Sequence, residues 1–188
     1  MIALLLVSTV AACDKPKPGQ PQADATPSAE SGPQAGLVDV SKKGMDAPAK
    51  PFLGPEGGPA TLATFRGKPL MVNLWATWCA PCVAEMPTLD ALAGEEKGRL
   101  NLIVVSQDLA GKKEVDPFFA KNKFQNLQPY LDKENVLMEA LKTETLPTTI
   151  FFDAKGKEQW RVVGAMDWRG ERAKKLIDDA LAPAAKAG

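Results

Sequence analysis

Two cysteines separated by two residues are the most reactive feature of the sequence. Cys79 and Cys82 lie in the segment WCAPC at 78–82, between an apolar run at 70–75 and an amphipathic stretch that begins at Pro81. Two cysteines at this spacing at the start of a helix can close a disulfide without moving the backbone. Unpaired amides and the helix dipole favour a thiolate on the first of them. Because a thiolate is the attacking species in disulfide exchange, we expect Cys79 to be the nucleophile and Cys82 to resolve the mixed disulfide.

Other uses of the pair have less support in the sequence. A purely structural disulfide is open, although so short a loop constrains the unfolded chain little. A zinc or iron–sulfur site needs further cysteines or histidines, but the chain has no histidine and its third cysteine is Cys13. Covalent haem attachment fails because Val83 stands where that motif requires histidine. A copper site using the pair and Met86 also stays open, and we otherwise expect no bound metal or cofactor.

Composition excludes several classes of function. The chain has 188 residues, with 23 Lys and Arg against 23 Asp and Glu, and no histidine. Without histidine there is no Ser-His-Asp triad and no Cys-His protease. A net charge of zero gives no basic footprint, so we expect no nucleic-acid partner. The length allows one ordinary domain with an appendage.

The N-terminal residues indicate export. Residues 2–12 are apolar or small, a run too short to span a bilayer but of the right length for a signal-peptide core. They end in Val-Ala-Ala-Cys, which resembles a bacterial lipobox with Cys13 as the lipidated residue. No basic residue precedes the run, and an exported protein with an incidental Cys13 is the alternative.

Residues 14–36 contain five prolines and no large apolar side chain. Such a segment cannot bury enough apolar surface to offset its ordering entropy, so we expect a disordered tether. The sequence thus predicts a signal peptide at 1–12, a lipidated cysteine and Pro-rich tether at 13–36, and one domain at 37–188.

Apolar patterning within the domain predicts an α/β fold. Four short apolar runs indicate strands, at 70–75, 102–106, 149–152 and 160–163. A turn at 153–157 should join the last two as an antiparallel hairpin. Four stretches indicate helices, at 81–93, 114–123, 135–141 and 171–181. Their order favours a mixed central sheet with helices on both faces, preceded by a small hairpin at 51–68.

Two segments make a resemblance specific. Residues 68–87 (KPLMVNLWATWCAPCVAEMP) are similar to the TlpA/ResA branch of the thioredoxin superfamily. Residues 145–149 (TLPTT) resemble the cis-proline loop of that family, and 163–168 resemble its segment before the last helix. The similarity covers roughly residues 51–181. It implies a thioredoxin fold with an N-terminal hairpin extension.

The resemblance assigns roles to individual residues. Cys79 and Cys82 match the redox-active disulfide, and Pro147 matches the cis-proline beside it, with an ordinary turn proline as the alternative. The family pairs the backbone before that proline with an extended substrate, so Leu146 becomes a candidate docking residue. We expect Trp78 to be half-exposed beside Cys79 and to add an apolar docking surface.

Two further positions concern proton transfer. Asn73 stands where thioredoxins keep a buried aspartate. Glu85 matches the acidic residue that the ResA-like branch places near the second cysteine. A partly buried carboxyl there would have a raised pKa and could exchange a proton with Cys82. The alternative is a first-turn glutamate favoured by the helix dipole.

The resemblance implies a periplasmic disulfide reductase tethered to the bacterial cytoplasmic membrane as a lipoprotein. Its clients would be disulfide-bearing proteins such as apocytochrome c or copper-delivery proteins for cytochrome oxidase. A membrane electron donor of the DsbD/CcdA type would reduce the pair again, and the protein would act as a monomer. The alternatives are a non-catalytic client-binding module and a copper metallochaperone using the two cysteines.

Overall fold

The computed structural model describes residues 36–182 of the chain. The predicted signal peptide, Cys13 and residues 14–35 of the predicted tether lie outside the described residues. The strands are β1 Leu37–Asp39, β2 Phe52–Leu53, β3 Pro59–Ala60, β4 Leu70–Trp75, β5 Asn101–Ser106, β6 Pro129–Leu131, β7 Thr148–Phe152 and β8 Glu158–Val163. The helices are a 3₁₀ turn η1 Leu62–Phe65 and the α-helices α1 Ala80–Glu95, α2 Lys112–Asn122, α3 Val136–Ala140 and α4 Glu171–Leu181. Within 36–182, no helix is long and apolar enough to cross a membrane.

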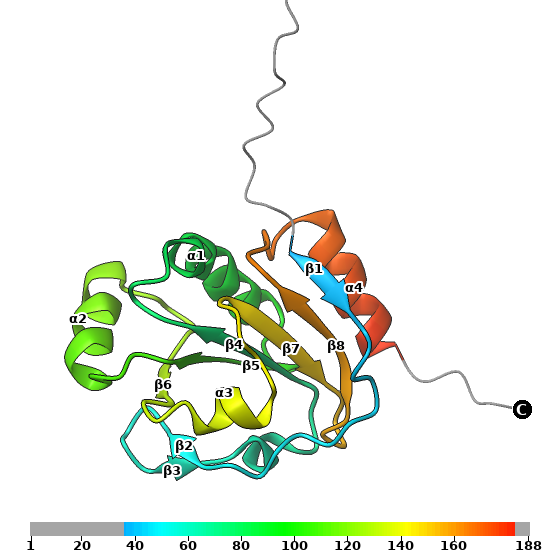
Figure 1. Ribbon diagram of the computed structural model, residues 1–188. Coiled ribbons are helices and arrows are strands. Elements are labelled where there is room, and N and C mark those ends of the chain that lie inside the picture. The colour runs from blue at the N-terminus through cyan, green and yellow to red at the C-terminus, as the bar shows by residue number, and fades with distance from the viewer. Residues whose placement is uncertain (1–35, 183–188) are drawn as a thin grey trace, which may run out of the picture. The chain divides into compact units, whose positions relative to one another are not determined.

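The described strands join in one mixed sheet (Figure 1). Their order is β1-β8-β7-β4-β5-β6-β2-β3. β4 and β5 run parallel, as do β5 and β6, whereas β4–β7 and β7–β8 are antiparallel pairs. This is the thioredoxin-like fold that the sequence predicts, and β4 lies near its centre.

The four predicted strands are confirmed, with bounds that differ by two residues or fewer. The hairpin predicted within 51–68 is confirmed as β2 and β3, and η1 follows it. The predicted helices are confirmed as well, and α4 has the predicted bounds. Two strands, β1 and β6, were not predicted. Each has three residues, and β6 begins with Pro129, so neither carries enough alternation for a period-2 pattern to be read from the sequence.

The sheet divides the apolar interior into two cores. Alternate residues of β4 point to opposite faces, as the pleat of a strand requires. Met71 and Trp75 belong to a core with the buried faces of α1 and α4 and with Val115 of α2. Leu70, Val72 and Leu74 belong to a second core that includes Leu137 of α3. The two cysteines lie in the first core, so the faces of the sheet have different surroundings.

Candidate functional site

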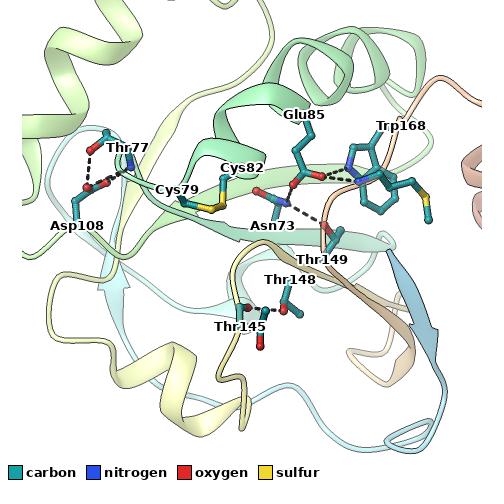
Figure 2. The surroundings of a disulfide bond; sticks show 11 residues. Asn73, Thr77, Cys79, Cys82, Glu85, Asp108, Thr145, Thr148, Thr149 and Trp168 are labelled. Atoms are coloured by element: carbon teal, nitrogen blue, oxygen red, sulfur yellow. Dashed lines mark hydrogen bonds between the residues drawn. A yellow bond between two sulfur atoms is a disulfide. The ribbon is translucent and has the colours of Figure 1, made fainter. Parts of the chain in front are cut away.

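The two cysteines lie where β4 passes into α1. Cys79 is the N-cap of α1, and Pro81 occupies the second helical position, where its missing N–H breaks no helical hydrogen bond. The Cys79 amide donates to the Ala76 carbonyl at 3.1 Å, which closes a tight turn before the helix. Cys79 and Cys82 form a disulfide with their Cα atoms 5.3 Å apart (Figure 2). The predicted position of the pair at a helix start is therefore confirmed.

Exposure distinguishes the two sulfur-bearing residues. Cys79 keeps 6% of its surface accessible and Cys82 keeps none. An incoming thiol or disulfide can therefore reach only the first cysteine. Trp78, expected to be half-exposed, is 70% exposed and belongs to neither core. Trp75 is fully buried beneath the turn and packs against Phe118, with ring centroids 5.0 Å apart.

A buried carboxylate holds the turn that leads to Cys79. Asp108, which follows β5, accepts hydrogen bonds from the Thr77 amide at 3.0 Å and from the Thr77 hydroxyl at 2.7 Å. The Ser106 hydroxyl donates to the same carboxylate at 2.7 Å. Sequence analysis missed this contact, since nothing in the spacing of Thr77 and Asp108 shows that β4 and β5 end side by side.

The predicted cis-proline loop lies across a groove from α1. The Leu146–Pro147 peptide bond is cis, as the resemblance implied. Pro147 is buried and Leu146 is half-buried. Both line an elongated groove of about 700 Å³, together with Pro81 and Glu85 of α1 and with Met166. The groove thus extends from the loop between the two cysteines along the cis-proline segment, with mostly apolar walls.

Glu85 is a buried carboxylate with three hydrogen-bond donors. Its Oε1 accepts from Asn73 Nδ2 at 2.7 Å, and its Oε2 accepts from the Met166 amide at 3.0 Å and from Trp168 Nε1 at 3.1 Å (Figure 2). Burial raises the pKa of Glu85 from 4.5 to about 7, and the donors from Met166, Asn73 and Trp168 oppose that rise. A carboxyl with this pKa can hold or release a proton at neutral pH.

The position of Glu85 contradicts one part of the prediction. It lies in the second turn of α1, whose first turn contains no acidic residue, so Glu85 is not a first-turn glutamate. The carboxylate oxygens are bonded to Asn73, Met166 and Trp168 and not to a cysteine. Sequence analysis marked Asn73 for its position but did not predict that it would connect Glu85 with β7 through Thr149.

The structure adds no further ligand to support metal binding by Cys79 and Cys82 within residues 36–182. Met86, the third ligand considered, is fully buried in the first core. In the described range, 36–182, no group of three or more Cys, Asp or Glu side chains is placed to hold a metal ion.

Known proteins are similar to this chain in sequence and in fold. The sequence model of the redoxin family matches residues 42–180. The thiol:disulfide interchange protein DsbE of Pseudomonas fluorescens biotype C is 38% identical over 128 residues, which cover 64% of this chain and 68% of that protein. The thiol-disulfide oxidoreductase ResA of Bacillus subtilis strain 168 is 29% identical over 132 residues, which cover 70% of this chain and 73% of that protein. A crystal structure described as a DsbE-type protein from Chlorobium tepidum superposes with a TM-score of 0.67 at 23% identity, covering 74% of this chain and 97% of that one.

Proposed function

The chain belongs to the redoxin family and is a thiol-disulfide oxidoreductase, and from this premise we propose that Cys79 and Cys82 reduce disulfides in client proteins. One observation carries the proposal. The chain holds a disulfide at the N-terminus of α1, and only its first cysteine is accessible. A disulfide kept only for stability would need neither the helix terminus nor this asymmetry.

The reaction passes two electrons from the protein to the client. The Cys79 thiolate attacks one sulfur of the client disulfide, forming a mixed disulfide and releasing the other client sulfur as a thiolate. Cys82 then loses its proton and attacks the Cys79 sulfur, which releases the second client thiolate. The protein is left with the Cys79–Cys82 disulfide, and the client holds two thiols once its thiolates have taken up protons. The N-terminus of α1 favours the Cys79 thiolate that begins this sequence.

Glu85 is the residue we propose to accept the proton from Cys82. It lies three residues further along α1, and the two side chains therefore share a helix face. Its pKa of about 7 lets it take up a proton near neutral pH. The carboxyl is held by Asn73 on β4 and by Met166 and Trp168 in the segment before α4.

Client docking is assigned to the surface around the accessible cysteine. The groove beside Leu146 and Pro147 has mostly apolar walls and a volume of about 700 Å³. Trp78 adds an exposed aromatic ring next to Cys79. We propose that an extended client segment lies along Leu146 with its disulfide over Cys79.

The cellular setting is proposed from the relatives and from the N-terminal sequence. Names such as DsbE and ResA belong to thiol-disulfide proteins, and the lipobox-like segment supports a lipid anchor on Cys13. We place the enzyme in the bacterial periplasm on the cytoplasmic membrane, acting as a monomer. Its clients would be apocytochrome c or copper-delivery proteins, and its electron donor would be of the DsbD/CcdA type.

Insulin reduction by the protein in the presence of dithiothreitol tests the function. The wild type should accelerate precipitation of the insulin B chain, and Cys79→Ser should abolish that acceleration because the nucleophile is lost. Cys82→Ser should stop turnover, and when it is reduced and then mixed with insulin in the absence of dithiothreitol it should accumulate the mixed disulfide, which mass spectrometry detects. The exposed Ser41, converted to Ala, is a control that should react like the wild type.

Three other results would contradict this proposal. Client binding that persists in both cysteine variants, without any reduction by the wild type, would favour a binding module. Tight Cu(I) binding without insulin reduction would favour a metallochaperone. A reduction potential near that of a strong oxidant, such as ~−120 mV, would reverse the assigned direction of electron flow.

A further inference from the structure

The side-chain oxygen of Asn73 has no hydrogen-bond partner among the described residues. Asn73 is fully buried in β4. Its Nδ2 donates to Glu85 Oε1 at 2.7 Å and to Thr149 Oγ1 at 2.9 Å, whereas its Oδ1 has no hydrogen-bond partner. Buried polar atoms are nearly always paired, so an unpaired amide oxygen in the core needs an explanation.

The orientation of the amide follows from its neighbours. The Asn73 nitrogen faces Glu85, because Nδ2 donates to Oε1 and the oxygens of the ionised carboxylate can only accept. The oxygen therefore turns to the opposite side of the amide. Figure 2 shows it directed from β4 toward the Cys79–Cys82 disulfide, on the side of Cys82. Neither sulfur of a disulfide carries a hydrogen, so the oxygen has nothing to accept in this redox state.

We propose that Asn73 Oδ1 accepts a hydrogen bond from the Cys82 thiol once the pair is reduced. This inference rests on the proposed function, since it assigns Asn73 a part in the same redox cycle. Reduction adds two electrons and up to two protons to the pair, and one of these protons becomes the Cys82 S–H. The oxygen is then satisfied in the reduced protein and unsatisfied in the oxidised one.

Two consequences follow from this asymmetry. An interaction present only in the reduced form stabilises that form, so Asn73 raises the reduction potential of the pair. A hydrogen bond from the thiol also favours its protonated state, so Asn73 raises the pKa of Cys82. The titratable side chains drawn around the pair besides the cysteines are Glu85 on α1 and Asp108 after β5. A change at Asn73 removes one hydrogen-bond donor from Glu85, so the experiment needs a control that removes such a donor without touching the Asn73 oxygen.

The redox equilibrium with glutathione provides the first test. Asn73→Ala removes the acceptor, and the equilibrium should shift roughly fivefold to tenfold toward the disulfide, equivalent to about 20–30 mV. Trp168→Phe is the matched control, because it also removes one donor to Glu85 but leaves the oxygen near Cys82 in place. The control should stay within about twofold of the wild type. An equal shift in both variants would attribute the effect to Glu85 and overturn the proposal.

The titration of Cys82 provides a second test that needs no redox activity. In a Cys79→Ser background Cys82 is a free thiol, and its thiolate absorbance against pH gives its pKa. Adding Asn73→Ala should lower that pKa, whereas adding Asn73→Asp, which keeps an oxygen acceptor, should hold it at or above the background value. No change with Asn73→Ala would overturn the inference even if the wild type reduces insulin. Failure of the proposed function would instead appear as a wild type that cannot reduce insulin.

Discussion

Glu85 shows how burial and hydrogen bonding compete at a single side chain. Its carboxyl is 4% exposed, and burial is the largest influence on its pKa. Three donors stabilise the charged form, but together they do not cancel the desolvation. The folded protein therefore holds a proton on this group over a pH range in which the unfolded chain has released it.

Stability should depend on pH through this one carboxyl. The pKa of Glu85 is raised from 4.5 to about 7, so its contribution is fully present below pH 4.5 and is lost as the pH rises through 7. The free energy of unfolding should fall by roughly 3 kcal/mol across that interval on account of Glu85. Glu85→Gln removes this contribution, and the variant should gain stability relative to the wild type as the pH increases.

Urea unfolding of both proteins at several pH values measures this difference, because contributions of the other groups cancel. The same substitution should change the pH profile of insulin reduction near neutrality. Glu114→Gln, which alters an exposed carboxyl on α2, should follow the wild type in both experiments. If the wild type and Glu85→Gln show the same dependence on pH in both experiments, Glu85 does not exchange a proton in this pH range.

At the scale of elements, β8 supports the loop that carries the cis-proline. Arg161 forms a bidentate ion pair with Glu158, with both nitrogen–oxygen distances at 2.7 Å, and both residues are buried. The Arg161 Nη1 also donates to the Leu141 carbonyl at 3.0 Å, at the end of α3. This contact ties the sheet to the start of the segment that leads to Pro147.

Breaking the buried pair should be costly. Arg161→Ala leaves the Glu158 carboxylate buried without its partner, and we expect a loss of about 3–5 kcal/mol of unfolding free energy. Converting both residues to Met should cost less than the single change, because no lone charge remains in the interior. Urea unfolding compares the variants.

An exposed ion pair offers the matched control. Lys175 and Asp179 pair across one turn of α4 at 2.9 Å, with both side chains largely exposed. Lys175→Ala should leave the unfolding midpoint nearly unchanged, because exposed pairs contribute little. A single Arg161 variant as stable as this control would mean that Glu158 is not confined by the fold.

Across the whole molecule, the redox-active cysteines belong to one of the two cores that the sheet separates, and within residues 36–182 the other core contains no cysteine. The first core contains the disulfide and Trp168, whose indole donates to the buried carboxylate of Glu85. The second core packs α3 and the N-terminal hairpin against the opposite face. The groove is lined by residues of α1 and of the cis-proline loop, and its Leu146 packs against both cores.

The proposed anchor determines where the whole molecule works. If Cys13 carries a lipid, Cys13→Ala should move the protein from the membrane fraction to the soluble periplasmic fraction of the host cell. Fractionation followed by immunoblotting measures the distribution, and Ser8→Ala, within the apolar run, is the control that should stay with the membrane. Retention of the Cys13 variant on membranes would exclude lipidation at this residue as the anchor.

Local patterns made most of the fold and the centre of the site predictable. The spacing of Cys79 and Cys82, a proline between them and an apolar strand before them are short-range features, and each acts on the backbone within a few residues. The cis bond at Pro147 came from a family resemblance. The strands β1 and β6 were not predicted from the sequence, because three residues are too few to show an alternating apolar pattern.

The sequence by itself determined that a reactive cysteine begins a helix after a buried strand, since strand and helix signals depend on neighbouring residues. Only the tertiary structure decided which groups surround that cysteine. Glu85 meets Trp168 across 83 positions, and Asn73 meets Thr149 across 76. These contacts arise where sheet pairing and helix packing bring distant segments together, and no local pattern specifies which residues will meet there.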